Sequence, residues 1–322
     1  MTRLAPSPTG ALHLGNVRTF LLNWAAARQG GWRIVMRIED LDGPRVKPEA
    51  ATQALDVLAW LGMDWDGEPG YQSHDLSPYD AALEMLSRKR LTYECPATRR
   101  EIEAAASAPH ADDHELRYPG LYRPTHDPPT IPPGRPTATR LIVPDGPIAF
   151  TDEAHGPQSV DVQEQVGDFV VHTKAGLPAY QLAVVVDDAR QGITDVIRGD
   201  DLLRSTARQV LLYDDLDLGP PPRYRHVPLV YGPDGRRLAK RHGDTRVASY
   251  RDHHGTPAEK IIGLMAQWCG LSPDPDSGSI PRKNLVRQPM TIGEFLDRFD
   301  WAKLPPAPIT LTPEDDAWLK AN

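Results

Sequence analysis

Cysteine is scarce in this 322-residue chain, which contains only Cys95 and Cys269. Two cysteines cannot form the disulfide framework of a small secreted domain, and they fit a reducing compartment. No apolar run is long enough to span a membrane, and the N-terminus lacks the charged-then-apolar pattern of a signal peptide. We therefore expect a cytoplasmic protein with no membrane partner.

An excess of positive charge is also absent. The chain has 36 lysines and arginines against 44 acidic residues, a net charge of −8. This balance argues against a protein that coats nucleic acid, although RNA can still bind to a local basic surface. The length predicts a large core with two or three subdomains. Amphipathic runs over 48–62, 78–90, 257–269 and 291–299 predict helices.

The most informative stretch is 3–16, which reads Arg-Leu-Ala-Pro-Ser-Pro-Thr-Gly-Ala-Leu-His-Leu-Gly-Asn before a helix predicted over 17–27. A strand, a tight turn and a helix N-terminus present backbone N–H groups and a positive dipole end to phosphate. Gly15 removes a Cβ where a flat ring could lie, and His13 can donate to a phosphate oxygen. For His-Leu-Gly-Asn alone, an ordinary strand-to-helix turn is the alternative.

The full stretch resembles the first signature of the class I aminoacyl-tRNA synthetases, in the form used by the glutamyl branch. The resemblance implies an α/β fold: a Rossmann-type catalytic domain with an inserted subdomain and a short C-terminal helical region. It implies a glutamate site lined by Arg3, Leu4, Ala5, Pro6 and Ser7. It implies ATP contacts from Pro6, His13, Gly15 and Asn16, with His13 catalytic. Asn16 stands where the signature often has a second histidine, and it can still donate a hydrogen bond.

An acidic segment follows the buried strand predicted over 32–38. It begins at Glu39, and ligands of open α/β sheets bind where strands end. A carboxylate there can hold an ammonium group, and a solvated acidic loop is the alternative. The resemblance assigns Glu39 to the α-amino group of glutamate.

The second half of the chain contains two apolar runs. Val184 to Val186 predicts a buried parallel strand by composition, and 193–203 predicts a second strand with a charged exit. Arg198 in that exit could pair bidentately with a carboxylate, and an exposed turn arginine is the alternative. The resemblance continues over 178–212 and places Tyr180 and Arg198 in the glutamate pocket.

A basic loop at 235–244 resembles the second class I signature, the Lys-Met-Ser-Lys-Ser loop, which reads Arg-Leu-Ala-Lys-Arg here. A mobile, solvated turn is the alternative. The resemblance makes Lys240 catalytic, because the family's lysine at this position meets the charge that develops on the ATP phosphates. Arg237 replaces the first lysine and is a second ATP contact. The implied cofactors are ATP and Mg²⁺.

The resemblance divides the chain at the insertion. It implies a first catalytic half over 1–92, an inserted subdomain over 93–150, a second half over 151–250 and a helical region over 251–322 without an anticodon-binding domain.

In short relatives the insertion carries a zinc site of the form Cys-x-Cys followed by Tyr-x-x-x-Cys. Cys95 and Tyr118 are retained, but Ala97 and Tyr122 replace the other two ligands. Zinc needs four donors, or three in an open site, so we predict no structural zinc. A substitute metal site of Cys95 with His110 and His114 stays open as an alternative.

The acceptor is inferred from the short members of the family, which transfer glutamate to the queuosine base in the anticodon of tRNA(Asp). They resemble this chain in length, in the basic loop and in the closing Phe-Leu-Asp-Arg-Phe-Asp-Trp segment. The implied function is ATP-dependent activation of L-glutamate and its transfer to queuosine by a monomer, with phosphate contacts from Arg236, Arg237 and Arg241. Two alternatives stay open: a truncated synthetase that charges a tRNA 3′ end, and a non-catalytic binding protein.

Overall fold

The computed structural model describes residues 1–105, 116–124, 130–236, 238, 245–271 and 287–321. Contacts divide the chain into two compact units, each discontinuous in sequence. Unit 1 comprises residues 1–70, 195–201 and 225–322, and unit 2 comprises residues 71–194 and 202–224. These two units are a division by contacts within the structure. The division into four segments, which the family resemblance implies, stays a prediction.

Unit 1 begins with a parallel strand pair joined by a helix. Strand β1 (Thr2–Leu4) pairs with β2 (Ile34–Ile38) in the register Thr2 to Ile34 and Leu4 to Met36. A parallel pair needs a crossover, and α1 (Leu14–Gln29) provides it. Strand β9 (Asp195–Gly199) then returns to this edge, where the Asp195 amide donates to the Met1 carbonyl at 3.1 Å.

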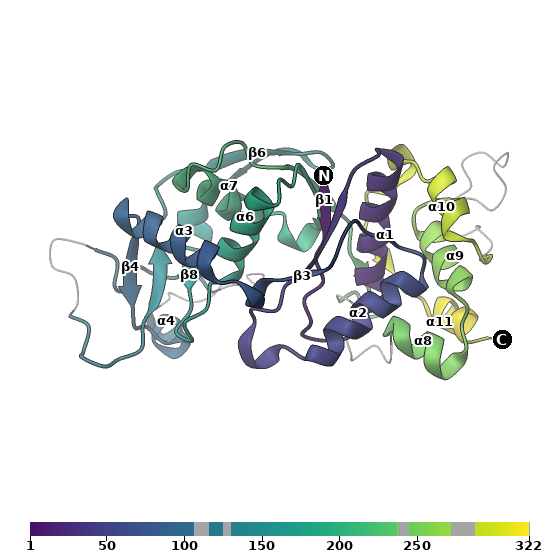
Figure 1. Ribbon diagram of the computed structural model, residues 1–322, viewed down its shortest axis with the longest axis horizontal. Coiled ribbons are helices and arrows are strands. Elements are labelled where there is room, and N and C mark those ends of the chain that lie inside the picture. The colour runs from purple at the N-terminus through teal and green to yellow at the C-terminus, as the bar shows by residue number, and fades with distance from the viewer. Residues whose placement is uncertain (106–115, 125–129, 237, 239–244, 272–286, 322) are drawn as a thin grey trace. The chain divides into compact units, whose positions relative to one another are not determined.

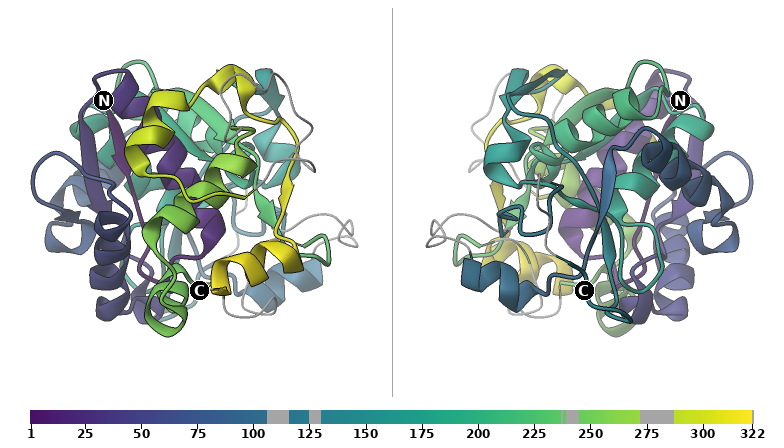
Figure 2. Two further views of the ribbon diagram at one scale, coloured as in Figure 1. Left: turned by 90° about the vertical axis from the view of Figure 1, so that its right-hand side faces the viewer. Right: turned by 90° about the vertical axis from the view of Figure 1, so that its left-hand side faces the viewer.

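The other elements of unit 1 follow the parallel strands or cover α1. They are η1 (Gly43–Arg45), α2 (Pro48–Trp60), β11 (Val230–Tyr231), α8 (Val247–His254), α9 (Ala258–Trp268), α10 (Ile292–Arg298), η6 (Trp301–Lys303), β12 (Ile309–Thr310) and α11 (Pro313–Lys320). Figures 1 and 2 show the C-terminal helices, green to yellow, gathered beside the purple α1. The helices predicted at α2, α9 and α10 are confirmed.

Helix α1 is the core of unit 1. Ten of its residues are buried, among them Leu21, Leu22 and Trp24. The helix begins three residues before the predicted start at Val17, because His13 caps it and adds a turn. The buried residues, which include the polar Arg18 and Asn23, are spread around the helix, so α1 has neighbours on several sides.

Unit 2 combines helices with antiparallel sheets. Its elements are η2 (Gln72–His74), α3 (Ser77–Arg88), β4 (Thr92–Cys95), α4 (Arg99–Ala105), β5 (Ala138–Leu141), β6 (Ile148–Asp152), β7 (Gly156–Val160), α5 (Val162–Gln165), β8 (Val170–His172), α6 (Tyr180–Arg190) and α7 (Ser205–Asp215). Strands β4, β5 and β8 form one antiparallel sheet, and β6 and β7 form a hairpin. The helix predicted at α3 is confirmed.

Three short elements lie where the chain passes from one unit to the other: β3 (Gly70–Tyr71), η3 (Asp200–Leu202) and β10 (Arg223–Val227). Strand β10 pairs in parallel with β6 through Tyr224 and Asp152, and its other neighbour is β9. Parallel strands linked by helices are the α/β arrangement that the sequence predicts.

The strand predicted over the valine run is wrong. Val184 to Val186 lie in the middle of helix α6, where every residue from Gln181 to Asp188 is buried. A helix that is covered on all sides reads as a continuous apolar run, and composition alone does not distinguish it from a buried strand. The buried Asp187 shows how the helix is held, because its carboxylate accepts from Gln72 and Tyr79, both at 2.8 Å.

The described helices include none that combines the length and the apolar character needed to cross a bilayer.

Candidate functional site

The N-terminal signature loop is joined to the loop that follows β2. The Glu39 amide donates to the Pro6 carbonyl at 3.1 Å, and the Lys47 amide donates to the Pro8 carbonyl at 2.9 Å. Arg3, at the end of β1, is buried, whereas Ser7 is exposed. The structure therefore brings Glu39 next to the segment that contains Arg3 to Ser7, as the predicted glutamate site requires.

Glu39 directly follows β2 and is positioned by Arg37, which lies on that strand. The Arg37 Nη2 atom lies 3.1 Å from Glu39 Oε1, and the two side chains are 1% and 12% exposed. Residues two apart on a strand point to the same face, which places this pair side by side. A carboxylate held in this way can accept from an ammonium group. No role for Arg37 was predicted from the sequence, although its position two residues before Glu39 was the available signal.

His13 is the N-cap of α1, and its ring closes the first turn of the helix. Its Nδ1 atom accepts from the backbone amides of Gly15 at 3.1 Å and Asn16 at 3.3 Å. Because Nδ1 accepts, we assign the proton of the neutral ring to Nε2. The Nε2–H group is then the donor that a phosphate oxygen would meet.

The motif predicts that the first amides of α1 are presented to a ligand, and in this conformation that prediction is wrong. The Gly15 and Asn16 amides donate to the His13 ring, and the His13 amide donates to the Asn16 side chain. The Leu14 amide donates to the Thr245 carbonyl at 3.2 Å. All four amides that a helix start leaves without an intrahelical partner are therefore paired. The helix dipole still favours negative charge at this end.

The segment that follows the basic loop lies against the same turn. The Val247 amide donates to the Leu12 carbonyl at 2.9 Å, and Arg246 forms an isolated antiparallel β-bridge with His13. The chain therefore leaves the loop directly beside the predicted catalytic histidine.

The entering side is also close to α1. Val230 Cβ lies 3.4 Å from the position that a Cβ on Gly15 would take. The buried Arg18 donates through Nη1 to the Pro228 carbonyl at 2.7 Å. The segments before and after the loop thus contact α1 or the turn that precedes it. Arg237, Lys240 and Arg241 themselves lie outside the described residues.

Arg198 lies on β9 and is 5% exposed, so the alternative of an exposed turn arginine is wrong. Its Nε atom donates to Nε2 of His226 on β10 at 3.0 Å, and His226 is fully buried. His226 stands outside every motif recognised in the sequence and was not predicted to belong to the site. Tyr180 belongs to unit 2, where it opens α6 and is 40% exposed. Its membership of the same pocket stays a prediction.

The insertion packs a core where the relatives' zinc site would lie. Cys95, Ala97 and Tyr118 are buried in one cluster, with Tyr122 packed against it. The Tyr118 hydroxyl lies 3.3 Å from Cys95 Sγ and accepts from the Tyr122 amide at 2.8 Å. Burial, with the hydrogen bond to Cys95, raises the pKa of the Tyr118 phenol, so the phenol stays neutral. These four positions do not fit a zinc ion.

We predict that the purified protein contains far less than one zinc ion per chain and that EDTA leaves its Tm unchanged, because hydrogen bonds and apolar contacts hold the insertion. Elemental analysis and thermal unfolding measure both. As a matched control, the double variant Ala97→Cys, Tyr122→Cys restores the four-donor set and should take up zinc. His110 and His114 lie outside the described residues. One zinc per chain in the unaltered protein would refute the prediction.

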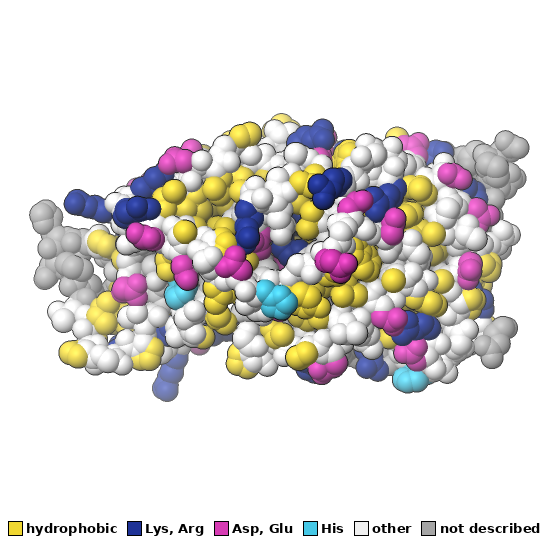
Figure 3. All heavy atoms as spheres, viewed as in Figure 1, with side chains coloured by type: hydrophobic (Ala, Val, Ile, Leu, Met, Phe, Trp, Pro, Cys, Tyr) yellow, Lys and Arg dark blue, Asp and Glu magenta, His cyan; other side chains and the backbone are white. Residues whose placement is uncertain are grey.

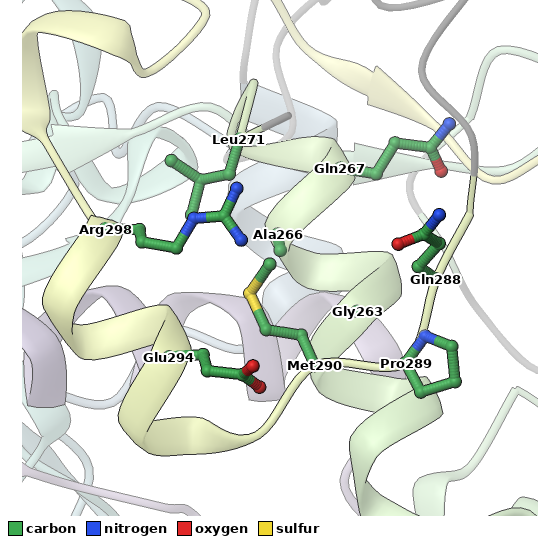
Figure 4. Close-up of a pocket in the computed structure, with 9 residues that line it drawn as sticks. All are labelled: Gly263, Ala266, Gln267, Leu271, Gln288, Pro289, Met290, Glu294 and Arg298. Atoms are coloured by element: carbon green, nitrogen blue, oxygen red, sulfur yellow. The ribbon is translucent and has the colours of Figure 1, made fainter. Parts of the chain in front are cut away.

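A small pocket of about 110 Å³ lies elsewhere in unit 1, between α9 and the segment leading into α10. Figure 4 shows Met290 and Arg298 extending toward Ala266. Among the residues that the structure describes, no predicted site residue lines this pocket. On the described part of the face in Figure 3, basic and acidic side chains are interspersed.

Comparisons with known proteins identify the family that the chain resembles. Residues 1–292 match the family model of the catalytic domain of class I tRNA synthetases (E and Q). A Rhodopirellula baltica protein named Glutamyl-Q tRNA(Asp) synthetase is 46% identical over 314 residues, covering 94% of this chain and 93% of that protein. A Nitrosomonas europaea glutamate–tRNA ligase is 38% identical over 322 residues, covering all of this chain and 66% of the ligase.

The fold has a solved counterpart. The crystal structure of a glutamate tRNA ligase from Elizabethkingia meningosepticum, in complex with its amino acid, superposes with a TM-score of 0.77 at 28% identity. The match covers 99% of this chain and 68% of the ligase chain. The predicted fold class is thereby confirmed.

Proposed function

Because the chain belongs to the class I tRNA synthetases of the glutamate and glutamine branch, we propose that it activates L-glutamate with ATP and transfers the glutamyl group to queuosine in the anticodon of tRNA(Asp). The observation that carries the proposal is the 46% identity to a Glutamyl-Q tRNA(Asp) synthetase over nearly the whole of both chains. The similarity to the glutamate–tRNA ligase is lower and reaches 66% of that protein. The proposed enzyme works as a monomer.

In the first step, a glutamate carboxylate oxygen attacks the α-phosphorus of ATP. The new P–O bond makes a mixed anhydride. The bond between the α-phosphorus and pyrophosphate breaks, and pyrophosphate leaves with the electron pair of that bond. Negative charge grows on the phosphate oxygens. In this proposal His13 stabilises the growing phosphate charge through Nε2–H. Lys240 and Arg237 stabilise the same charge from the basic loop. Pro6, Gly15 and Asn16 complete the ATP contacts, and Mg²⁺ bound with ATP neutralises phosphate charge.

The amino acid is recognised by its charges. Glu39, held by Arg37, binds the α-ammonium group of glutamate. Arg198 binds the carboxylate of the glutamate side chain. Arg3 lines the same site in this proposal. Selection of glutamate follows because a shorter or uncharged side chain would leave one of these buried charges without its partner.

In the second step, a hydroxyl of the queuosine base attacks the carbonyl carbon of the adenylate. An ester forms, AMP leaves, and the hydroxyl proton passes to a base or to water. Arg236 is exposed at the start of the basic loop and, with Arg237 and Arg241, would contact phosphates of the anticodon loop.

The test measures transfer of labelled glutamate to two preparations of tRNA(Asp), one with queuosine and one with unmodified guanosine at that position. We expect label only on the queuosine-containing tRNA. Equal labelling of both would indicate charging of the 3′ end and defeat the proposed acceptor. Absence of glutamate-dependent pyrophosphate exchange without tRNA would indicate a non-catalytic binding protein instead.

A further inference from the structure

Arg198 and His226 form a buried pair on neighbouring strands of unit 1. The Arg198 Nε atom lies 3.0 Å from His226 Nε2, and the two residues are 5% and 0% exposed. Strands β9 and β10, which carry them, are adjacent in the sheet. The pair is therefore set by the rigid sheet and not by a loop.

The direction of this hydrogen bond follows from the chemistry of the two groups. A guanidinium keeps its proton in proteins and has only donors, so His226 Nε2 must accept. An imidazole that accepts at Nε2 is neutral and carries its proton on Nδ1. A ring protonated at both nitrogens would turn a donor and a positive charge toward Arg198.

A bond at Nε also fixes the plane of the guanidinium. Arginine recognises a carboxylate through parallel N–H groups in that plane, so a rotation of the plane costs the second hydrogen bond. The strand backbone places the Arg198 Cα, but it leaves the side-chain torsions open. The hydrogen bond from Nε to His226 limits rotation of the guanidinium plane.

We propose that His226 is a positioning residue: its neutral Nδ1–H form orients the guanidinium of Arg198 and thereby sets the affinity for glutamate. The inference rests on the proposed function, in which Arg198 holds a carboxylate of the substrate. A fully buried histidine can also act only in packing, and the experiment separates the two roles.

The experiment compares the KM values for glutamate and ATP in pyrophosphate exchange. In His226→Gln the amide oxygen can take the place of Nε2, whereas the shorter side chain of His226→Asn cannot reach it, and His226→Leu has no acceptor. Loss of a hydrogen bond to a buried charged group predicts a rise of about ten- to a hundredfold in the glutamate KM for Leu and Asn. The Gln variant should stay within about threefold of the unaltered protein, with the ATP KM unchanged throughout.

Val227→Ala is the matched control, since Val227 is the next residue on β10 and is also fully buried. It removes packing, so it should lower Tm and leave both KM values unchanged. A ¹⁵N spectrum of the imidazoles, with His226 assigned by its absence in the Gln variant, should show the proton on Nδ1. This last readout does not depend on whether the Leu or Asn variants fold.

Arg198→Ala separates failure of this inference from failure of the proposed function. If that variant raises the glutamate KM while His226→Asn and His226→Leu behave like Val227→Ala, the positioning role is wrong and the pocket stands. A proton on Nε2 of His226 would also overturn the positioning role. If Arg198→Ala leaves the glutamate KM unchanged, the proposed glutamate site itself is wrong.

Discussion

Replacement of Lys240 by alanine is expected to lower glutamate-dependent pyrophosphate exchange about a hundredfold, mainly in kcat, because one electrostatic donor to the transition state contributes on the order of 3 kcal/mol. The loop that carries Lys240 returns to the protein at Thr245, whose carbonyl accepts from the Leu14 amide in the first turn of α1. The described chain after the loop therefore begins beside the first turn of α1, next to His13.

Lys303→Ala is the matched control for this experiment. Lys303 is an exposed lysine of the same unit, in η6, and its removal should leave exchange unchanged. An exchange rate in Lys240→Ala equal to that of the control would remove Lys240 from the mechanism. Normal adenylate formation with slow transfer to tRNA would instead place Lys240 in the second step.

Replacement of Arg198 by alanine is expected to raise the KM for glutamate by about two to three orders of magnitude. The reason is that removal of one partner of a buried, hydrogen-bonded charge pair costs about 2–5 kcal/mol. The KM for ATP should change little. Arg198→Lys keeps the positive charge but loses the planar fork, so its effect should be intermediate. Steady-state exchange at varied glutamate and at varied ATP measures both constants.

Arg28→Ala serves as the control for loss of an arginine. Arg28 lies at the end of α1 and makes partly exposed ion pairs with Asp64 at 2.9 Å and Asp66 at 3.2 Å. Its loss should reduce stability modestly and leave the glutamate KM unchanged. An Arg198→Ala variant with a normal glutamate KM would mean that the substrate carboxylate binds elsewhere.

Much of the fold was predictable because its signals are local. The strand before the proline turn, the helix after His13 and the amphipathic helices each depend on residues within a few positions of one another. The family resemblance reached His13, Glu39 and Arg198 for the same reason, since each stands in a short run of recognisable spacing. The comparisons confirm the family and the fold, while the roles of the individual site residues stay predictions.

The predictions that failed depend on surroundings. Val184 to Val186 have the composition of a strand, but they lie in the buried part of α6. Because the helix is buried all around, its apolar residues show no helical period that the sequence could reveal. The first amides of α1 are paired because the His13 ring turns back over them and Thr245 approaches from the far end of the basic loop. Neither partner is visible in the spacing of the motif.

The sequence by itself determined the family and the parallel α/β class, and it named the residues proposed to hold a phosphate, an ammonium group and a carboxylate, because these are properties of contiguous residues. Only the tertiary structure decided how the charges are held. It paired Arg198 with His226, 28 positions along the chain, and it placed Arg246, which follows the basic loop, beside His13. The physical reason is that burial and hydrogen-bond direction depend on which distant segments meet, and that is a property of the folded chain.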